Sequence, residues 1–260
     1  MQDKIGDSIA ELAYKAYEQK LFNSVKTGPM PKHIAIIMDG NRRFAREYGL
    51  DEAEGHKKGR QKLDEVLNWC FELNVKVLTV YAFSTDNFKR ATKEIEGLMQ
   101  IFYDSLDDAI KDERIYKNKV RIKIIGRREL IPKVLLEKIE RLEELTKDFT
   151  NYYFNIALAY GGREEIIFAI KKIAKMVKDG ELKIEDIDEK KVSDNMYTQN
   201  LPDPDLLLRT SGEERVSNFL LWQIAYSEIY FSDVYWPTFK KLDFLRAIHS
   251  YQLRKRRFGV

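Results

Sequence analysis

Cysteine and histidine are scarce in this chain of 260 residues, which has one Cys and three His. A single cysteine excludes an intrachain disulfide framework and a cysteine-rich metal site. His33, His56 and His249 lie far apart in the sequence without ligand spacing, so a zinc site is not supported. Cys70 stands among apolar residues, and we expect it to be a core residue rather than a nucleophile.

Long apolar runs and an excess of one charge are also missing. No uncharged run approaches the roughly 18 residues of a membrane span, and the start, MQDKIGDSIAEL, lacks the apolar core of a secretory signal. The 45 basic and 42 acidic residues leave a net charge of +3, which is too small to hold a nucleic acid through bulk electrostatics. With 44% hydrophobic residues, we expect a cytoplasmic globular protein with one domain over residues 1–260.

Strand-like and helix-like segments alternate along the chain. Continuous apolar strands with helices between them indicate an α/β fold with a mainly parallel central sheet flanked by helices on both faces. We expect strands at 33–38, 77–83, 120–125, 154–160, 205–209 and 229–231. We expect helices at 5–25 (in a lead-in segment 1–30), 56–73, 94–117, 132–148, 163–178 and 241–256, with a surface excursion at 180–200.

Polar segments follow three of the predicted strands. Residues 39–43 (DGNRR), 84–90 (STDNFKR) and 209–218 (RTSGEERVSN) each combine arginine with an acid and with small hydroxyl or amide side chains. In open α/β sheets, ligands bind at the carboxyl ends of strands. Arginine forks and the N–H groups of a helix start hold phosphate oxygens, and a carboxylate holds a cation that screens them. The three segments therefore predict a site for a phosphorylated ligand and a divalent cation.

Each segment also has an ordinary structural explanation. Asp39 is a favoured helix N-cap, and Asp-Gly-Asn is a common turn. Asp107 and Asp108, within a predicted helix, are interpreted as a solvated face, and so is the basic run 254–257. The sequence has no GxxxxGK[ST] or GxGxxG motif, which argues against P-loop and dinucleotide sites. The coincidence at three strand ends carries the prediction.

Six segments carry a resemblance to a known family. They are HIAIIMDGNRRFA, EGHKKG, TVYAFSTDNFKR, IIGRREL, AYGGREEI and LLLRTSGEERVSNFLLWQIAYSEIYF, and they run along most of the chain. Together they resemble the cis-prenyltransferases, which make undecaprenyl and dehydrodolichyl diphosphates by adding isopentenyl units to an allylic diphosphate. Arg42, where bacterial members have glycine, makes the pattern similar to the archaeal and eukaryotic branch.

The resemblance implies a Mg²⁺-dependent transferase that condenses isopentenyl diphosphate in cis onto a farnesyl or geranylgeranyl diphosphate primer and makes a long-chain glycosyl carrier lipid. It implies that Asp39 and Asn87 are catalytic and that Asp39 and Glu228 hold Mg²⁺. Because the Asn87 amide is a poor base, we expect it to orient a diphosphate oxygen that takes the proton. The implied substrate-binding residues are Gly40, Asn41, Arg42, Arg43, Phe44, His56, Ser84, Thr85, Asp86, Phe88, Arg90, Arg209, Arg215, Val216 and Ser217.

The family threads the growing chain into a hydrophobic tunnel. Residues on one side of the helix expected at 94–117 suit such a tunnel, although their spacing suits an ordinary core equally well; they are Leu98, Ile101, Phe102 and Leu106. Residues 152–154 are expected to cap the tunnel. The ending Arg257-Phe258-Gly259 matches the family's RxG ending, which reaches a neighbour's active site, so the resemblance implies a homodimer. Product release implies a transient contact with a membrane surface.

Two positions depart from the bacterial pattern. Glu52 stands where an arginine faces the allylic diphosphate, so Arg42 is expected to supply that charge. Glu214 replaces a histidine near the metal, and a Mg²⁺ ligand and a solvated turn residue are equally open interpretations. Two other functions compete with the enzyme. The catalytic residues oppose a non-catalytic partner subunit, and the balanced charge opposes a nucleic-acid-binding protein.

Overall fold

A computed structural model describes the backbone of residues 2–254 and the side chains of residues 10–254. In this part of the chain six strands form one sheet in the order β3-β4-β2-β1-β5-β6, and every neighbouring pair is parallel. The predicted α/β fold with a parallel central sheet is confirmed. The strands are β1 (His33–Ile37), β2 (Val77–Ser84), β3 (Val120–Ile125), β4 (Tyr152–Tyr160), β5 (Leu206–Arg209) and β6 (Glu228–Phe231).

The helices follow the predicted order, with three differences. A short helix, α2, begins directly after the turn at 39–40 and precedes the helix expected at 56–73. The helix expected over 94–117 is divided at Asp112, whose extended backbone (φ −75°, ψ 106°) ends α4 and whose side chain caps α5 by accepting from the Arg114 N–H at 2.9 Å. The segment 180–200 contains a short helix, α8, that was not predicted. The helices are α1 (Gln2–Thr27), α2 (Asn41–Glu47), α3 (Glu52–Glu72), α4 (Thr92–Lys111), α5 (Glu113–Lys117), α6 (Lys133–Thr146), α7 (Gly162–Lys178), α8 (Glu189–Ser193) and α9 (Lys241–Leu253).

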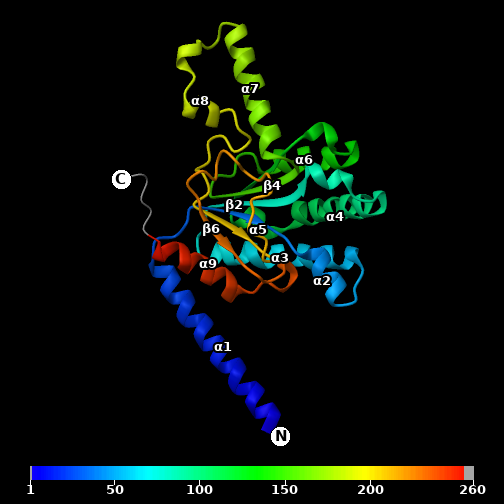
Figure 1. The fold of residues 1–260 in the computed structure, drawn as a ribbon, viewed down its shortest axis with the longest axis vertical. Helices are drawn as coiled ribbons and strands as arrows, with labels where there is room; N and C mark the ends of the chain where they lie inside the picture. Colours follow the sequence, from blue (N-terminus) through cyan, green and yellow to red (C-terminus); the bar gives the residue numbers. More distant parts are fainter. Residues whose placement is uncertain (1, 255–260) are drawn as a thin grey trace.

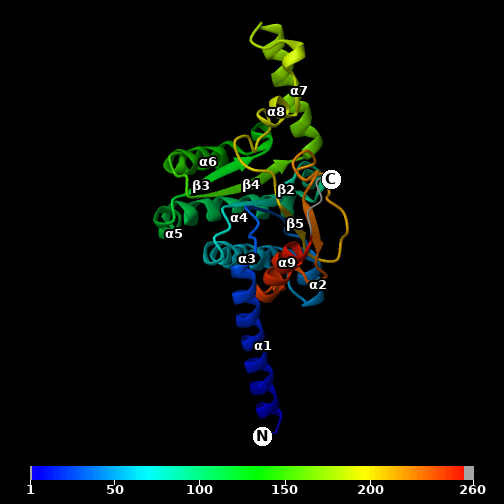
Figure 2. The ribbon, with the colours of Figure 1, turned by 90° about the vertical axis from the view of Figure 1, so that its left-hand side faces the viewer.

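Both faces of the sheet are covered, because successive side chains of a strand point to opposite faces. Ile34 and Ile36 of β1 belong to the larger core, to which α3, α4, α6 and α9 contribute. Ala35 and Ile37 face a smaller core that includes residues from the segment 216–224. Figures 1 and 2 show α1 projecting from one end of the molecule and α7 with α8 from the other. Among residues 2–254, no helix combines the length and the apolar character that a membrane span needs.

Candidate active site

Three strand ends meet at one edge of the sheet. β1 lies between β2 and β5, and Ile37 at its end is in register with Tyr81 of β2 and Arg209 of β5. The segments 39–43, 84–90 and 209–218 are therefore brought together although they are far apart in the sequence. A cavity of about 750 Å³ lies between them.

Most of the residues expected to act in catalysis or to bind substrate line this cavity. They are Asp39, Gly40, Asn41, Arg42, Arg43, His56, Ser84, Asp86, Asn87, Arg90, Arg209 and Ser217. Five others do not line it. Phe44 is buried and stacks on Tyr48, Thr85 donates to Glu164, Phe88 packs on Phe83, Arg215 pairs with Glu213, and Val216 packs against the smaller core.

The cavity also has lining residues that the sequence reasoning missed. Arg46 lies one helical turn after Arg42 on α2, and that spacing was a usable signal. Asn218, the last residue of the segment 209–218, and Tyr81, within the strand expected at 77–83, line the cavity as well but were not among the expected site residues. Tyr81 belongs to an apolar run that predicts a buried strand, so the sequence does not mark it as a site residue. The register of β1 with β2 brings it to this edge of the sheet.

The Asp39 carboxylate sits between two arginines at the centre of the site. Its Oδ2 accepts from Arg209 at 2.8 Å, and its Oδ1 lies 3.1 Å from a guanidinium nitrogen of Arg43. The Asp39 carbonyl accepts from the Thr210 hydroxyl at 2.6 Å and from the Trp236 N–H at 3.0 Å. Side chain and backbone are both held, so the direction of the carboxylate is set before any ligand binds.

Asp39 is ionised at neutral pH. Burial favours its neutral form, but the hydrogen bonds and charges of Arg209 and Arg43 outweigh that effect and hold the pKa of the carboxyl below its ordinary value. A carboxylate already charged is ready to take part in binding a cation without first losing a proton.

Glycines allow the turn after β1 to pack closely against its surroundings. Gly40 has φ 107°, in the left-handed region, and a Cβ there would lie 2.9 Å from the Tyr235 ring. A Cβ on Gly55 of α3 would lie 2.4 Å from the carbonyl oxygen of Asn41. The Gly55 of the EGHKKG segment therefore lets α3 lie directly against the start of α2.

Arginines give the cavity a positive lining. Its charged residues are Arg42, Arg43, Arg46, Arg90 and Arg209 with the two acids Asp39 and Asp86. Positive charge of this kind favours an anionic ligand, and arginine forks suit phosphate oxygens.

Glu52 pairs with these arginines. Its Oε1 lies 3.0 Å from Arg42 Nε and 2.9 Å from Arg46. The carboxylate therefore lies against two cationic side chains and holds them near the cavity. The same two contacts give Glu52 a structural role beside the cavity.

Asn87 is part of a reciprocal cap. Its Oδ1 accepts from the Ser84 N–H at 2.9 Å, and the Ser84 hydroxyl accepts from the Asn87 N–H at 3.2 Å. With its oxygen used in this way, the remaining hydrogen-bonding group of the side chain is the amide nitrogen, which only donates. This arrangement agrees with an orienting role and opposes a role as a base.

His56 of α3 also lines the cavity. Its Nε2 is 3.6 Å from a carboxylate oxygen of Glu94, which accepts from Arg90 at 2.9 Å. Burial and the nearby charge of Arg90 lower the pKa of His56, and Glu94 opposes the shift only in part. His56 is therefore neutral at pH 7 and can donate or accept a hydrogen bond.

The structure places Glu228 away from Asp39, the residue with which it is expected to hold Mg²⁺. Glu228 begins β6 in register with Leu206, the first residue of β5, and so lies at the amino edge of the sheet, whereas Asp39 lies at the carboxyl edge. Glu228 pairs with Arg254 at 2.6 Å. A motif places a residue in the sequence, but the direction of its strand decides the edge at which it lies.

The two glutamates after β5, Glu213 and Glu214, lie in different surroundings. Glu213 bridges Arg43, at 2.9 Å, and Arg215, whereas Glu214 is exposed. These contacts favour the solvated turn residue among the two interpretations of Glu214. Among the described residues, no group of three or more His, Cys, Asp or Glu side chains is arranged to hold a metal.

An apolar cavity of about 170 Å³ lies next to the polar one. The two share Met38, Asn41, His56, Ala82 and Leu98 as lining residues. The apolar cavity lies between α3, α4 and strands β2 to β4, and its lining includes all four residues expected to form a tunnel: Leu98, Ile101, Phe102 and Leu106. Of the expected capping residues, Phe154 lines the cavity, and Tyr152 packs edge-on against Phe71, which lines it too.

Comparison with known proteins decides the family. The family model described as "Putative undecaprenyl diphosphate synthase" matches residues 37–259. The chain belongs to this family of cis-prenyltransferases. The resemblance found in the sequence motifs is thereby confirmed.

Relatives match this family member over almost their whole length. A protein of Thermoplasma volcanium named tritrans,polycis-undecaprenyl-diphosphate synthase (geranylgeranyl-diphosphate specific) is 56% identical over 98% of this chain and 99% of its own. A Methanocaldococcus jannaschii protein of the same name is 51% identical over 94% of this chain and 88% of its own. Both are archaeal, in agreement with the branch that the motifs indicated.

Solved structures agree with the fold. Lavandulyl diphosphate synthase from Lavandula x intermedia, in complex with dimethylallyl diphosphate, superposes with a TM-score of 0.85 at 38% identity and covers 89% of this chain and 99% of its own. A probable undecaprenyl diphosphate synthase from Campylobacter jejuni has a TM-score of 0.73 at 35% identity, over 89% and 100% of the two chains. The Arg257–Gly259 ending of this family member lies outside the described residues.

Proposed function

We propose that this cis-prenyltransferase condenses isopentenyl diphosphate units in cis onto geranylgeranyl diphosphate and makes a long-chain polyprenyl diphosphate that serves as a glycosyl carrier lipid. The primer follows from the relatives named as specific for geranylgeranyl diphosphate, two of which cover 98% of this chain at 56% and 53% identity. One observation carries the proposal: an arginine-lined cavity around Asp39 lies next to an apolar cavity and shares five lining residues with it. That combination suits a molecule with a diphosphate head and a hydrocarbon tail.

The two diphosphates bind on opposite sides of Asp39. Arg42 and Arg43 on α2, with Asn41, bind the diphosphate of the allylic primer, whose tail extends past His56 into the apolar cavity. Arg209 and Ser217 bind isopentenyl diphosphate. Arg209 already donates to Ser217 at 2.7 Å and to the Arg215 carbonyl, so its guanidinium direction is held by the loop after β5.

The reaction needs a diphosphate to leave. Breaking the bond between C1 of the primer and its diphosphate oxygen puts negative charge on the leaving group and allylic cation character on C1. The guanidinium groups of Arg42 and Arg43 stabilise the developing negative charge, because fixed positive groups act most strongly where charge appears in the transition state. The double bond of isopentenyl diphosphate then attacks C1, and a proton leaves its C2.

The residues around Asp39 fit a Mg²⁺ ion held with substrate phosphates. Mg²⁺ is usually bound through one or two carboxylates together with phosphate oxygens and water rather than by a cage of protein ligands. Asp39 is an ionised carboxylate in the arginine-lined cavity and suits this mode of binding. When bound, Mg²⁺ supplies Lewis-acid stabilisation of the leaving diphosphate.

The proton goes to a diphosphate oxygen that Asn87 holds. With its own oxygen in the Ser84 cap, the Asn87 amide nitrogen donates a hydrogen bond to that oxygen and fixes its direction. Arg90, paired with Glu94, lies on the same segment and neutralises the charge of the phosphate.

Three further assignments belong to this proposal. Residues 1–260 form a single domain, supported by one sheet that contains all the described strands. The protein acts as a homodimer, supported by the match of residues 257–259 to the ending that reaches a neighbour's site. It acts in the cytoplasm and contacts the membrane surface when the lipid product leaves, because the product is too apolar for water.

Incubation with labelled isopentenyl diphosphate, Mg²⁺ and either farnesyl or geranylgeranyl diphosphate tests the proposal. We expect incorporation with geranylgeranyl diphosphate and a lipid product of many units, sized after removal of the diphosphate. Incorporation with farnesyl diphosphate alone would overturn the choice of primer. If no primer led to incorporation, the assignment as an enzyme would be overturned, and the alternative of a non-catalytic partner subunit would remain.

A further inference from the structure

One wall of the apolar cavity is made of charged and polar side chains. Where α3 and α4 face the sheet, the lining of the cavity is apolar. Along the boundary between α3 and α4, six polar residues form the lining. We call these six residues the polar seam. They are Arg60 and Asp64 of α3, Ser105 and Asp108 of α4, Asp112 between α4 and α5, and Arg114 of α5.

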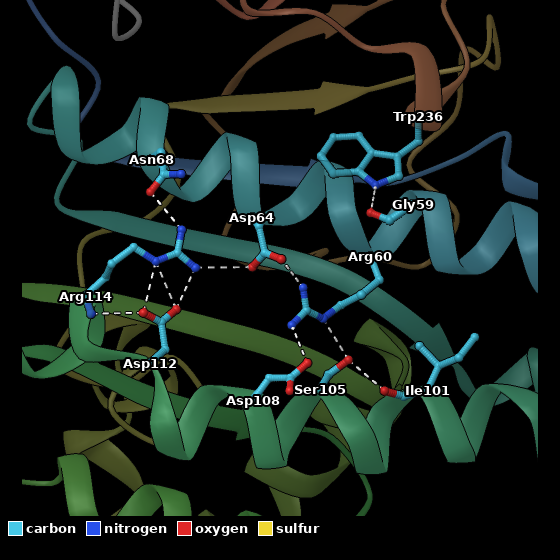
Figure 3. Close-up of polar contacts among 10 residues, drawn as sticks. All are labelled: Gly59, Arg60, Asp64, Asn68, Ile101, Ser105, Asp108, Asp112, Arg114 and Trp236. Carbon is cyan, nitrogen blue, oxygen red and sulfur yellow. Dashed lines mark hydrogen bonds and ion pairs between the residues drawn. The ribbon is translucent and has the colours of Figure 1, made fainter.

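The polar seam is bonded from one helix to the other (Figure 3). Arg60 donates to the Ser105 hydroxyl at 2.9 Å and to Asp108 at 3.2 Å, and it also pairs with Asp64 on its own helix. Arg114 donates to Asn68 of α3 at 2.8 Å, lies 3.5 Å from Asp64, and pairs with Asp112 at 2.6 Å. Two arginines thus join α3 to α4 and α5.

Asp108 is therefore more than a solvated residue. Its side chain is 71% exposed but bonds to Arg60, which is 48 residues away in the sequence. Asp107 pairs with Lys138 of α6. Neither partner could be seen from the spacing along the helix, because both come from other helices.

The cavity is too small for the lipid that the proposed function requires. At about 170 Å³ it lies below the roughly 300–1,000 Å³ of pockets that hold a drug-sized ligand. A geranylgeranyl tail is as large as a drug-sized ligand, and each turnover adds five carbons to it. The walls must move apart as the chain grows.

The walls differ in how strongly they resist this movement. Where α3 and α4 pack on the sheet, buried residues such as Val66, Leu98 and Leu106 join the main core, and separating them would expose apolar surface to water. The polar seam is partly exposed, with Arg60 25% and Arg114 38% accessible, and ion pairs of that kind contribute little. Its charged groups can also bind water when they separate.

We infer that the polar seam is the wall that opens as the prenyl chain grows, and that its ion pairs set the length at which elongation gives way to release. The inference rests on the proposed function. Each added unit drives the tail further against the seam, so the resistance of the seam raises the barrier to the next condensation. A weaker seam permits more additions before release, and products become longer.

Two substitutions weaken the seam at different points. Arg60→Gln removes the links to Ser105 and Asp108, and Arg114→Gln removes the links to Asp64 and Asn68. Lys138→Gln is the control, because it removes an ion pair that joins the same helix α4 to α6 outside the cavity. Each protein is incubated with geranylgeranyl diphosphate and labelled isopentenyl diphosphate, and both the first condensation rate and the product lengths are measured.

We expect the ratio of elongation to release at the longest wild-type product to rise about two- to fivefold in each seam variant, the range that loss of one exposed ion pair gives. The control keeps the wild-type lengths. Raising KCl from about 0.1 M to about 1 M shortens the screening length from about 10 Å to about 3 Å, so it lengthens wild-type products and changes the variants less. This salt series needs no variant to fold.

Several results would overturn the inference. They are unchanged or shorter products in both seam variants, equal lengthening in Lys138→Gln, or wild-type lengths that do not rise with salt. Failure of the proposed function has a different signature, because the wild-type protein would then add no unit to any primer. If the wild-type protein elongates normally but the seam variants give the same product lengths, only the inference about the polar seam is contradicted.

Discussion

Asp39 and Arg209 form a hydrogen-bonded ion pair of 2.8 Å across 170 residues of sequence. Asp39 follows β1 and Arg209 ends β5, and these two parallel strands are neighbours in the sheet. The pair links the part of the cavity proposed for the allylic diphosphate with the part proposed for isopentenyl diphosphate. Both residues are therefore expected to control activity, but in different ways.

Replacing Asp39 tests its proposed role in holding Mg²⁺. Asp39→Asn keeps the size of the side chain and removes its charge, so we expect the initial rate of isopentenyl incorporation to fall by at least about a hundredfold, as for the loss of one charge-stabilising group. Glu214→Gln is the control, because Glu214 is exposed and Glu213 makes the ion pairs. A loss as large in Glu214→Gln would assign that residue to the metal instead.

Arg209→Lys should weaken binding of isopentenyl diphosphate. Arg209 donates at once to Asp39, Ser217 and the Arg215 carbonyl, and a lysine ammonium cannot reproduce the planar fork. We expect the KM for isopentenyl diphosphate to rise about tenfold, which corresponds to about 1.4 kcal/mol, and the KM for the primer to change much less. Equal increases in both KM values would indicate a general disturbance of the site.

Asn87→Asp separates capping from catalysis. The aspartate keeps an oxygen that can accept from the Ser84 N–H, so the turn and the melting temperature are expected to be retained. It loses the amide donor and adds a negative charge among phosphates, so kcat should fall. Full activity with an unchanged pH profile would show that the amide has no special role.

Gly55→Ala should disturb the site by sterics alone. The new Cβ would lie 2.4 Å from the Asn41 carbonyl, so α3 or the start of α2 must shift, at a cost of about 1–3 kcal/mol in the free energy of unfolding. Gly97→Ala in α4 is the matched control, because its new Cβ would meet open space and alanine favours a helix by about 0.5–1 kcal/mol. Urea unfolding should rank Gly97→Ala above wild type and Gly55→Ala below it.

His33 should make stability fall in acid. Its Nδ1 donates at 2.7 Å to the Pro202 carbonyl, which can only accept, and the Nε2 of the neutral ring then accepts from the Thr79 hydroxyl at 2.7 Å. Burial lowers the pKa of His33 to about 4, whereas the unfolded chain takes up this proton near pH 6.5.

The sign of the effect follows from that difference. Because the unfolded chain binds more protons below pH 6.5, the free energy of unfolding contributed by His33 is constant above that pH and falls as pH drops towards about 4, by up to about 3 kcal/mol. Urea unfolding at pH 7 and pH 5 measures the fall, and His249→Gln should keep it. A His33→Gln protein with the same pH dependence as wild type would assign the fall to other groups.

Much of the fold could be predicted from the sequence. Apolar runs marked the strands and helical periodicity marked most helices, because burial imposes those patterns on any parallel sheet with covered faces. The split at Asp112 was missed, since a cap residue inside an apolar periodic stretch looks like one more exposed position. The segments that form the candidate site were recognised too, from arginines and acids placed directly after apolar strands.

The amino-acid sequence by itself determined the strands, the helices, the family and the chemistry available at three strand ends. Only the tertiary structure decided which ends meet, because β1 lies between β2 and β5 and that order is not the order of the chain. It also showed that Glu228 lies at the amino edge of the sheet and that Arg60 donates a hydrogen bond to Asp108. Motifs record which residues are present, whereas strand direction and contacts between distant helices arise only when the chain packs.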